Sequence, residues 1–517
     1  MNETVGVSPE PVRRKSQTSP RSVHSGIRVR NPFKRRSSES GGSSSEYDPS
    51  DSVPHVARSL DKTLQGIDFT RAILLLLHKL SVPQWRSIPE DLAHVIDVRR
   101  IFGALTNSIY QITLPEGATA GYKGVIPRTA PKLLLRLYGA NLDALIDRPH
   151  ELAMLKRLSK HNIGPLLLGT FTNGRFEQWL DSHTLQRREM RDPNLSCSIA
   201  RRMRELHDGV KLSHLEKHSM PSVFQMLDKW LPRARDIIAH RRKKGTGRLS
   251  DLNLPILGKR KGIDQHNFWA SDNLILAQKW QMFELALGRY RLFMEEQYPP
   301  QVLKHSLAFC HNDALPPFHL SELTYQAQYG NILRIENQAQ LNSPDQRHRQ
   351  LIVIDFEYAA PNPRAYDLAN HFCEWMYNYH NNIPYMPILQ DYPSPAERNR
   401  FLEAYVAHGR GIQGDKADAI ATLEMEIRDW RAASHAFWCA WGVVMSEDDP
   451  ELVIMNGDEM EDVREERPLE DVGATASDFD YIAYADQKMR LFWGDLASGR
   501  FFDDYKDGIE GCNSIQD

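Results

Sequence analysis

The chain has 517 residues, of which 41% are hydrophobic and 25% are charged, as in an ordinary globular protein. Its net charge of −3 argues against a nucleic-acid-binding protein, and its five cysteines form no CxxC pair, which argues against a disulfide framework or a zinc site. No apolar run reaches the length of about 18 residues that a membrane helix needs, and the N-terminus lacks an apolar signal core. We therefore expect a cytoplasmic protein without stable membrane insertion.

Changes in composition along the chain predict its organisation. Residues 1–52 are rich in Ser, Arg and Pro and nearly free of aromatic side chains, so we expect a disordered basic tail. Apolar residues at helical spacing predict a helical extension over residues 53–97. Residues 98–182 have the apolar pattern of a β-rich region, and residues 183–505 that of a larger, mostly helical region. Residues 506–517 are expected to form a C-terminal tail.

A strand, a tight turn and a second strand are predicted over residues 98–114. A turn of this kind can offer its backbone N–H groups to phosphates and so act as a lid over a nucleotide. The turn contains a single glycine, and an ordinary hairpin is the alternative interpretation. The candidate phosphate-binding residues are Gly103, Ala104, Leu105, Thr106, Asn107 and Ser108.

A lone cation, Arg136, interrupts the apolar strand predicted over residues 132–138. We expect Arg136 to contact a phosphate and to pair with Glu151 near the start of the next helix, as a Lys–Glu pair does in protein kinases. An arginine on an edge strand is the alternative interpretation. A later hairpin ends in a crossing segment with Gln178 and Leu180, where the backbone of a nucleotide kinase would meet adenine.

Residues 307–377 carry the strongest chemical signal. Asp313 follows one short apolar run, Asn331 follows a glycine, and Asp355 follows a second apolar run. Phosphoryl transfer needs a carboxylate that takes the proton of the attacking hydroxyl, and an amide oxygen and a second carboxylate that hold Mg²⁺ on the nucleotide phosphates. The order of these residues predicts a kinase-like site that uses ATP and Mg²⁺, with Asp313 as base and Asn331 and Asp355 as metal ligands. Simple strand ends are the alternative.

Together these segments resemble the choline/ethanolamine kinase family, and most of all its fungal choline kinases, over roughly residues 53–495. The most specific similarity lies in residues 354–358 and continues through Asn362 to residues 366–375. The resemblance implies an α+β, two-lobed protein-kinase-like fold with a small β-rich N-lobe and a larger, mostly helical C-lobe. It also implies phosphorylation of choline to phosphocholine, the first step of the CDP-choline route to phosphatidylcholine. Family members are often homodimers.

A trimethylammonium group has no N–H to donate, so aromatic faces and nearby carboxylates must select it. Trp438 and Trp441 are three positions apart on a predicted helix and therefore share a face. Aromatic residues at helical spacing more often belong to a core, but the resemblance places this set around the amine. It implies substrate contacts from Gln328, Glu374, Tyr379, Trp438, Trp441, Phe479 and Tyr484.

The chain departs from the family between Asp313 and Asn331, which are 18 positions apart instead of in one short motif. Deleting residues 314–326, or equally 315–327, restores the family spacing. The longer connection costs only about 1 kcal/mol of closure entropy, whereas misplacing a catalytic group by about 1 Å costs on the order of a hundredfold in rate. The insert either bulges out while its anchors stay in place or arises from the joining of coding segments.

The acceptor and the activity both have alternatives. The triplet Cys373-Glu374-Trp375 is of the choline type, although ethanolamine kinases share the acidic motifs and dual use is common in the family. If the insert displaces Asp313 and Asn331, we expect a catalytically silent scaffold instead of an enzyme.

Overall fold

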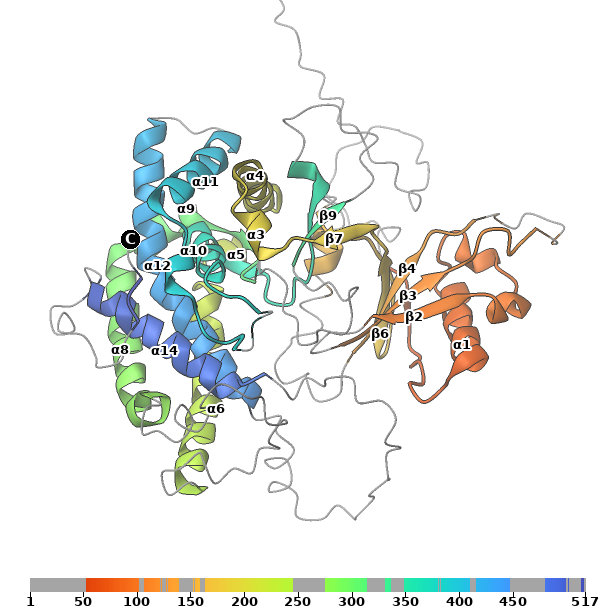
Figure 1. Cartoon of the computed structure of the whole chain (residues 1–517), viewed down its shortest axis with the longest axis horizontal. Coiled ribbons are helices and arrows are strands. Elements are labelled where there is room, and N and C mark those ends of the chain that lie inside the picture. Colours follow the sequence, from red (N-terminus) through yellow and green to blue (C-terminus); the bar gives the residue numbers. More distant parts are fainter. Residues whose placement is uncertain are drawn as a thin grey trace, which may run out of the picture. The chain divides into compact units, whose positions relative to one another are not determined.

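Figure 1 shows the computed structural model of the chain. It describes residues 53–101, 107–120, 122, 127, 129–138, 152, 154–158, 163–244, 275–313, 331–335, 348–379, 381, 383–409, 415–446, 479–498, 501 and 513–515. The expected tail over residues 1–52, residues 103–106 of the expected phosphate turn, Glu151 and Gln328 lie outside the described residues.

The N-terminal lobe is built on a six-stranded sheet with the order β1-β5-β6-β4-β3-β2. Its strands are β1 (His55–Val56), β2 (Asp97–Ile101), β3 (Asn107–Thr113), β4 (Leu133–Tyr138), β5 (Leu167–Phe171) and β6 (Gly174–Gln178). Neighbouring strands run antiparallel, except that β1 pairs in parallel with β5. Leu133, Leu135 and Leu137 alternate along β4 and are almost fully buried, as expected for the core-facing side of a strand.

Helix α1 (Gly66–Lys79) packs on this sheet and accounts for most of the predicted helical extension (Figure 1). The ring of Phe69 lies 5.4 Å from that of Tyr110 on β3, and Leu77 is fully buried. The extension is not helical throughout, because β1 adds to the sheet beside β5. Pairing there satisfies backbone groups that an isolated extended segment would leave open.

The rest of the described chain is mostly helical. Its helices are α3 (Arg187–Met190), α4 (Pro193–Gly209), α5 (His214–Lys217), α6 (Ser222–Lys244), α8 (Ile275–Gln297), α9 (Pro300–Ser306), α10 (Arg364–Glu374), α11 (Pro395–His408), α12 (Lys416–Met445) and α14 (Tyr481–Ser498). Helix α12 packs against α14, α10, α6 and α11, and Figure 1 shows α12 and α14 side by side. Among the helices that the structure describes, none combines the length and apolar character needed to cross a bilayer.

Two small sheets position the candidate site. One has the order β10-β9-β7, and the other pairs β11 with β8. Their strands are β7 (Ser182–Thr184), β8 (Leu307–Cys310), β9 (Ile332–Ile335), β10 (Leu351–Val353) and β11 (Ala360–Pro363). The ends of these strands carry the predicted phosphoryl-transfer residues: Asp313 follows β8, Asn331 precedes β9, and Asp355 follows β10. The predicted hairpin between β9 and β10 is confirmed, with Leu333 opposite Ile352.

Part of the expected C-terminal tail contacts α14. The backbone N–H of Asn513 donates to the carbonyl oxygen of Arg490 at 3.1 Å, and its side-chain amide donates to Gln487 at 3.1 Å. Ile515 is buried. Residues 513–515 therefore belong to the packed helical lobe.

Candidate active site

A buried carboxylate on α10, Asp367, fixes the loop that follows β8. The backbone N–H groups of His311 and Asn312 donate to its two oxygens at 3.0 and 2.7 Å. His207 on α4 lies 2.9 Å from the same carboxylate, and the Tyr405 hydroxyl lies 2.6 Å from the other ring nitrogen of His207. Burial acts to raise the pKa of Asp367, but the bond to His207 and the backbone donors outweigh it and hold the pKa below its usual value. Asp367 is therefore an ionised anchor for the loop.

Asn312 gives the loop its turn. It has a φ of 65°, a left-handed conformation that asparagine tolerates better than most residues. Its side-chain amide donates to the carbonyl oxygens of Tyr358 at 2.8 Å and Ala360 at 3.3 Å. Its side-chain oxygen accepts a bond from Asn362 at 2.9 Å. These contacts hold the backbone in the conformation that delivers Asp313.

Asp313 and Asn331 meet despite the long connection between them. The side-chain amide of Asn331 donates to the carboxylate of Asp313 at 3.0 Å and to its carbonyl oxygen at 2.6 Å. The backbone N–H of Ile354 donates to the carbonyl oxygen of Asn331 at 2.9 Å, which ties this pair to the residue before Asp355. The intervening residues 314–330 lie outside the described residues, but both anchors of the connection are in contact.

Several other carboxylates lie near Asp313, so its negative charge is poorly balanced by positive charge. Burial, followed by the charges of Glu357, Asp355 and Glu374, raises the pKa of Asp313 well above its usual value. One carboxylate oxygen of Asp313 and one of Asp355 are buried without a hydrogen-bond partner among the described residues. Oxygen atoms from carboxylates and amides are the donors that Mg²⁺ takes, so this donor set fits a magnesium ion. Because Asn331 donates through Nδ2, its Oδ1 is the atom that would bind the metal.

Arg136 reaches this group of acids from the N-terminal lobe. Its Nη1 lies 3.9 Å from Oδ2 of Asp355, and its Nε lies 3.4 Å from Oε1 of Glu177 on β6. Arg175 binds the same Glu177 oxygen at 2.6 Å. The edge-strand interpretation is wrong, since β4 lies between β3 and β6 and Arg136 is 6% exposed. The predicted partner, Glu151, lies outside the described residues, and Glu177 pairs with Arg136.

The remaining predicted nucleotide contacts lie at strand ends. Asn107, of which only the backbone is described, and Ser108 begin β3 opposite Tyr138 and Leu137 of β4. Gln178 ends β6. Its backbone N–H donates to the carbonyl oxygen of Leu166 at 2.9 Å. The hydroxyl of Ser182 donates to the carbonyl oxygen of Leu180 at 3.1 Å. Their role at the adenine stays a prediction.

The predicted acidic residue of the amine pocket, Glu374, is fully buried at the end of α10. It accepts a hydrogen bond from the Tyr379 hydroxyl at 2.7 Å. Its other oxygen lies 3.3 Å from Nζ of Lys488 on α14, which is also fully buried. The same ammonium stands 4.2 Å from the ring centre of Tyr377 and 5.1 Å from that of Tyr484. Glu374 thus already has a cationic partner within the protein.

The predicted aromatic residues form one connected cluster on α12 and around the start of α14. The rings of Trp438 and Trp441 lie 5.3 Å apart, and Trp441 lies 5.9 Å from Tyr484. Phe479 lies 5.6 Å from Tyr484. Tyr358, three residues after Asp355, joins the cluster: Trp441 donates to its hydroxyl at 2.8 Å, and its ring lies 5.7 Å from that of Trp438.

Asn370 connects the aromatic cluster to the catalytic loop. Its side-chain oxygen accepts bonds from the Trp438 indole at 2.7 Å and the Ser434 hydroxyl at 2.8 Å. Its amide donates to the carbonyl oxygen of Asn312 at 3.2 Å. Helix α10 therefore carries Asp367, which holds the loop after β8, Asn370, which holds Trp438, and the predicted pocket acid Glu374.

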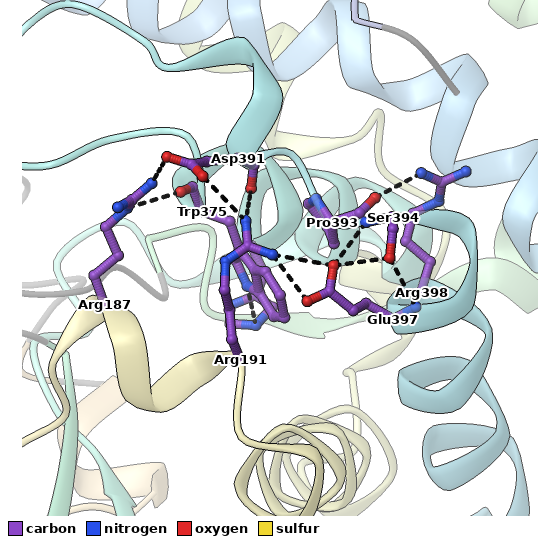
Figure 2. Close-up of polar contacts among 9 residues, drawn as sticks. Arg187, Arg191, Trp375, Asp391, Pro393, Ser394, Glu397 and Arg398 are labelled. Carbon is purple, nitrogen blue, oxygen red and sulfur yellow. Dashed lines mark hydrogen bonds and ion pairs between the residues drawn. The ribbon is translucent and has the colours of Figure 1, made fainter.

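Arg187 on α3 and Arg191, just after this helix, hold the segment that follows Glu374. Figure 2 shows Arg187 and Arg191 reaching the carbonyl oxygen of Trp375 and the side chain and backbone of Asp391. Arg191 also binds Glu397 at 2.8 Å and stands 5.2 Å from the ring centre of Trp375. These contacts fix the C-terminal end of α10 and so the position of Glu374.

Residues 98–493 match the model of the choline/ethanolamine kinase family. The chain belongs to this family. It is 32% identical to a choline kinase of Saccharomyces cerevisiae, with 88% of this chain and 80% of the relative aligned. It is 33% identical to a choline kinase of Schizosaccharomyces pombe (83% and 89%) and 28% identical to an ethanolamine kinase of Saccharomyces cerevisiae (86% and 79%).

The family assignment confirms the predicted enzyme class, a kinase, and implies ATP as the phosphoryl donor. The solved structure of a choline kinase from Cryptosporidium parvum Iowa II superposes with a TM-score of 0.52 at 22% identity, covering 81% of this chain and 93% of that one. The predicted two-lobed kinase fold is confirmed.

Sequence reasoning on this kinase missed four residues that the structure brings into the site. Asp367 and Tyr358 lie within residues 354–375, between the predicted site residues Asp355 and Glu374, and this position was the available signal. Lys488 is four residues after Tyr484, so a helix puts both on one face. No sequence pattern pointed to Glu177, because its pairing with Arg136 depends on the register between β4 and β6.

Proposed function

We propose that this kinase transfers the γ-phosphoryl group of ATP to the hydroxyl of choline and forms phosphocholine, the first step of the CDP-choline route to phosphatidylcholine. The observation that carries the proposal is the contact between Asp313 and Asn331. It unites the predicted base with a predicted metal ligand beside a cluster of aromatic rings. The fungal relatives named choline kinase support the choice of acceptor.

Asp313 is the residue that takes the proton of the choline hydroxyl. Its carboxylate is oriented by Asn331, and the anchored backbone of His311 and Asn312 fixes its position. The raised pKa of Asp313 makes it a stronger base than an exposed aspartate. Phosphoryl transfer depends chiefly on positioning and on charge stabilisation, and this loop supplies the positioning.

Asn331 and Asp355 would hold a magnesium ion through Oδ1 of Asn331 and the carboxylate of Asp355. When bound, the ion supplies neutralisation of the charge on the nucleotide phosphates. Arg136, 3.9 Å from Asp355, supplies a fixed guanidinium at the same place. Buried between β3 and β6, it points a permanent positive charge toward the acids.

The charge balance of the amine pocket favours choline over ethanolamine. An ethanolamine ammonium needs hydrogen-bond acceptors, and the carboxylate of Glu374 already binds Tyr379 and Lys488. A trimethylammonium group needs aromatic faces, which Trp438, Trp441 and their neighbours offer. Ethanolamine, named for one relative, is the alternative acceptor.

A parallel assay tests the proposal. The full chain is incubated with ATP and Mg²⁺ and with either choline or ethanolamine, and the phosphorylated products are quantified. We expect a higher kcat/KM for choline, and a kcat roughly a thousandfold lower for Asp313→Asn. A higher kcat/KM for ethanolamine would change the acceptor, and nucleotide binding without turnover on either amine would make the chain a scaffold.

The other expectations stay predictions. A cytoplasmic location and a homodimeric assembly were inferred from sequence and resemblance, as was the contact of Gln328 with the substrate hydroxyl. Peptide mass spectrometry of the native protein decides whether residues 314–326 are present, since a fragment containing residues 320–323 would show that the insert is translated.

A further inference from the structure

Outside the active site, three metal-ligating side chains from distant parts of the sequence meet at one point. They are Glu205 on α4, His348 in the turn before β10, and His408 at the end of α11. One oxygen of Glu205, Oε1, lies 3.0 Å from Nε2 of His348 and 3.5 Å from Nε2 of His408. The ligand atoms of all three lie within 4.8 Å of one another.

The two distances from Glu205 to the histidine nitrogens suit a tetrahedral metal ion. Ligand atoms about 2.0 to 2.1 Å from such an ion lie about 3.3 Å from each other. The two imidazole rings stand edge to face, with centres 4.8 Å apart and planes at 68°, so they converge without stacking. One carboxylate and two imidazoles form a donor set used by zinc sites that keep their fourth position open.

An ion pair with a neighbouring arginine orients the carboxylate of Glu205. Arg202 binds the second oxygen of Glu205 at 2.7 Å and so directs Oε1 toward the histidines.

The cluster is also reachable from solvent. The side chains of Glu205 and His408 are 25% and 29% exposed, while that of His348 is 4% exposed. An ion can therefore enter on the side of α4 and α11, with His348 as the inner ligand.

We infer that Glu205, His348 and His408 form a second metal site, selective for zinc or a similar transition ion. Its nitrogen donors separate it from the magnesium site, whose donors are all oxygen atoms, because imidazole suits zinc and nickel whereas magnesium prefers oxygen. This inference does not depend on the acceptor of the kinase.

The position of the site gives a bound ion a structural consequence. Glu205 is two residues from His207, which holds Asp367 under the catalytic loop. His348 is in the turn that leads into β10 and then to Asp355. An ion would connect α4, α11 and the start of β10, and its binding free energy would stabilise the folded chain.

Cobalt(II) tests the site with a readout that is independent of activity. The purified, metal-stripped full chain is titrated with Co²⁺ and then with Zn²⁺ while the visible spectrum and the thermal midpoint are recorded. We expect one equivalent of Co²⁺ to give the intense absorption of a four-coordinate site, Zn²⁺ to displace it, and Zn²⁺ to raise the midpoint.

Variants locate the binding. His408→Gln and Glu205→Gln should each weaken binding by at least about tenfold, as even supporting residues of metal sites do, and should remove the rise in midpoint. The double variant His214→Gln/His218→Gln is the matched control, because it removes a stacked histidine pair at the two ends of α5, with ring centres 4.3 Å apart.

Because His408 is partly exposed, its variant should fold even if the buried His348→Gln does not. The inference is overturned if the wild-type chain binds no Co²⁺ in four-coordinate form, or if binding survives His408→Gln and Glu205→Gln. Loss of binding in the α5 double variant alone would also overturn it, by placing the ion on α5.

Discussion

The proposed phosphoryl-transfer end and the proposed amine end of this site are held in different ways. At the first end, Asp313, Asn331 and Asp355 stand on loops after or before short strands, and hydrogen bonds to backbone groups fix them. At the second end, Glu374 and the aromatic rings stand on or beside α10, α12 and α14, whose packing fixes them. At one end the polar contacts join loops, whereas at the other the polar contacts lie within packed helices.

The two ends also differ in charge. Asp313 and Asp355 each have a buried oxygen without a partner among the described residues, so this end calls for a cation brought by the nucleotide. Glu374 has an internal partner, Lys488. We therefore expect changes at the first end to act on kcat, and changes at the second end to act on stability and on the KM for choline.

Asp313→Asn should have the largest effect. It removes the proton acceptor but keeps the shape and the contact with Asn331, so kcat should fall by roughly a thousandfold. Nucleotide affinity, measured by calorimetry, should stay within a few-fold of wild type. A variant with more than a tenth of the wild-type kcat would remove Asp313 from the proton transfer.

Lys488→Met should destabilise the amine end by about 3 kcal/mol, because it leaves the buried charge of Glu374 without its partner. Chemical denaturation measures the loss. Lys488→Met combined with Glu374→Gln is the control and should recover most of the stability. Choline should raise the thermal midpoint of the single variant more than that of wild type, since its ammonium replaces the missing charge. An unchanged stability would contradict internal neutralisation.

Asp367→Asn should lower the free energy of unfolding by about 2 kcal/mol at pH 7, because buried N–H donors lose a charged acceptor. The folded pKa of Asp367 lies below 3.8, so its contribution is present above this pH and is lost as the pH falls below it. The difference in the free energy of unfolding between variant and wild type should therefore become smaller as the pH falls below 3.8. A constant difference in denaturation experiments between pH 7 and pH 3 would contradict the ionised anchor.

Trp441→Ala should raise the KM for choline by roughly tenfold, the effect of losing one desolvated cation–π contact. The KM for ATP should not change. Trp441→Phe keeps an aromatic face and loses only the bond to Tyr358, so its effect should be smaller. Equal changes in both KM values, measured by initial rates, would assign Trp441 to the core.

Deletion of residues 314–326 should have the smallest effect. Because Asp313 and Asn331 are already in contact, the shorter connection should leave kcat within a few-fold and change stability by only about 1 kcal/mol. Steady-state assays and denaturation of the two forms test this. A large gain in kcat on deletion would show that the insert displaces the anchors.

Local patterns were enough to predict much of the fold and the candidate site. The short apolar runs before Asp313 and Asp355 indicated strand ends, and helical spacing indicated that Trp438 and Trp441 share a face. Side-chain partners were harder to find. The predicted partner of Arg136, Glu151, lies outside the described residues, and the register of β4 and β6 brings Glu177 to Arg136. Lys488 was overlooked because a lysine on an amphipathic helix normally points to solvent.

The order of residues by itself determined the family, the lobes and the identity of the acids and aromatic rings, because periodicity and motif are local properties of a chain. Only the tertiary structure decided that Asn331 reaches Asp313 across its long connection, that Asp367 anchors the loop, and that Glu374 is neutralised from α14. It also decided that Glu205, His348 and His408 meet. Such contacts join positions that are far apart in the chain. Their geometry is set by the packing of helices and strands, and the spacing of residues along the chain does not reveal this packing.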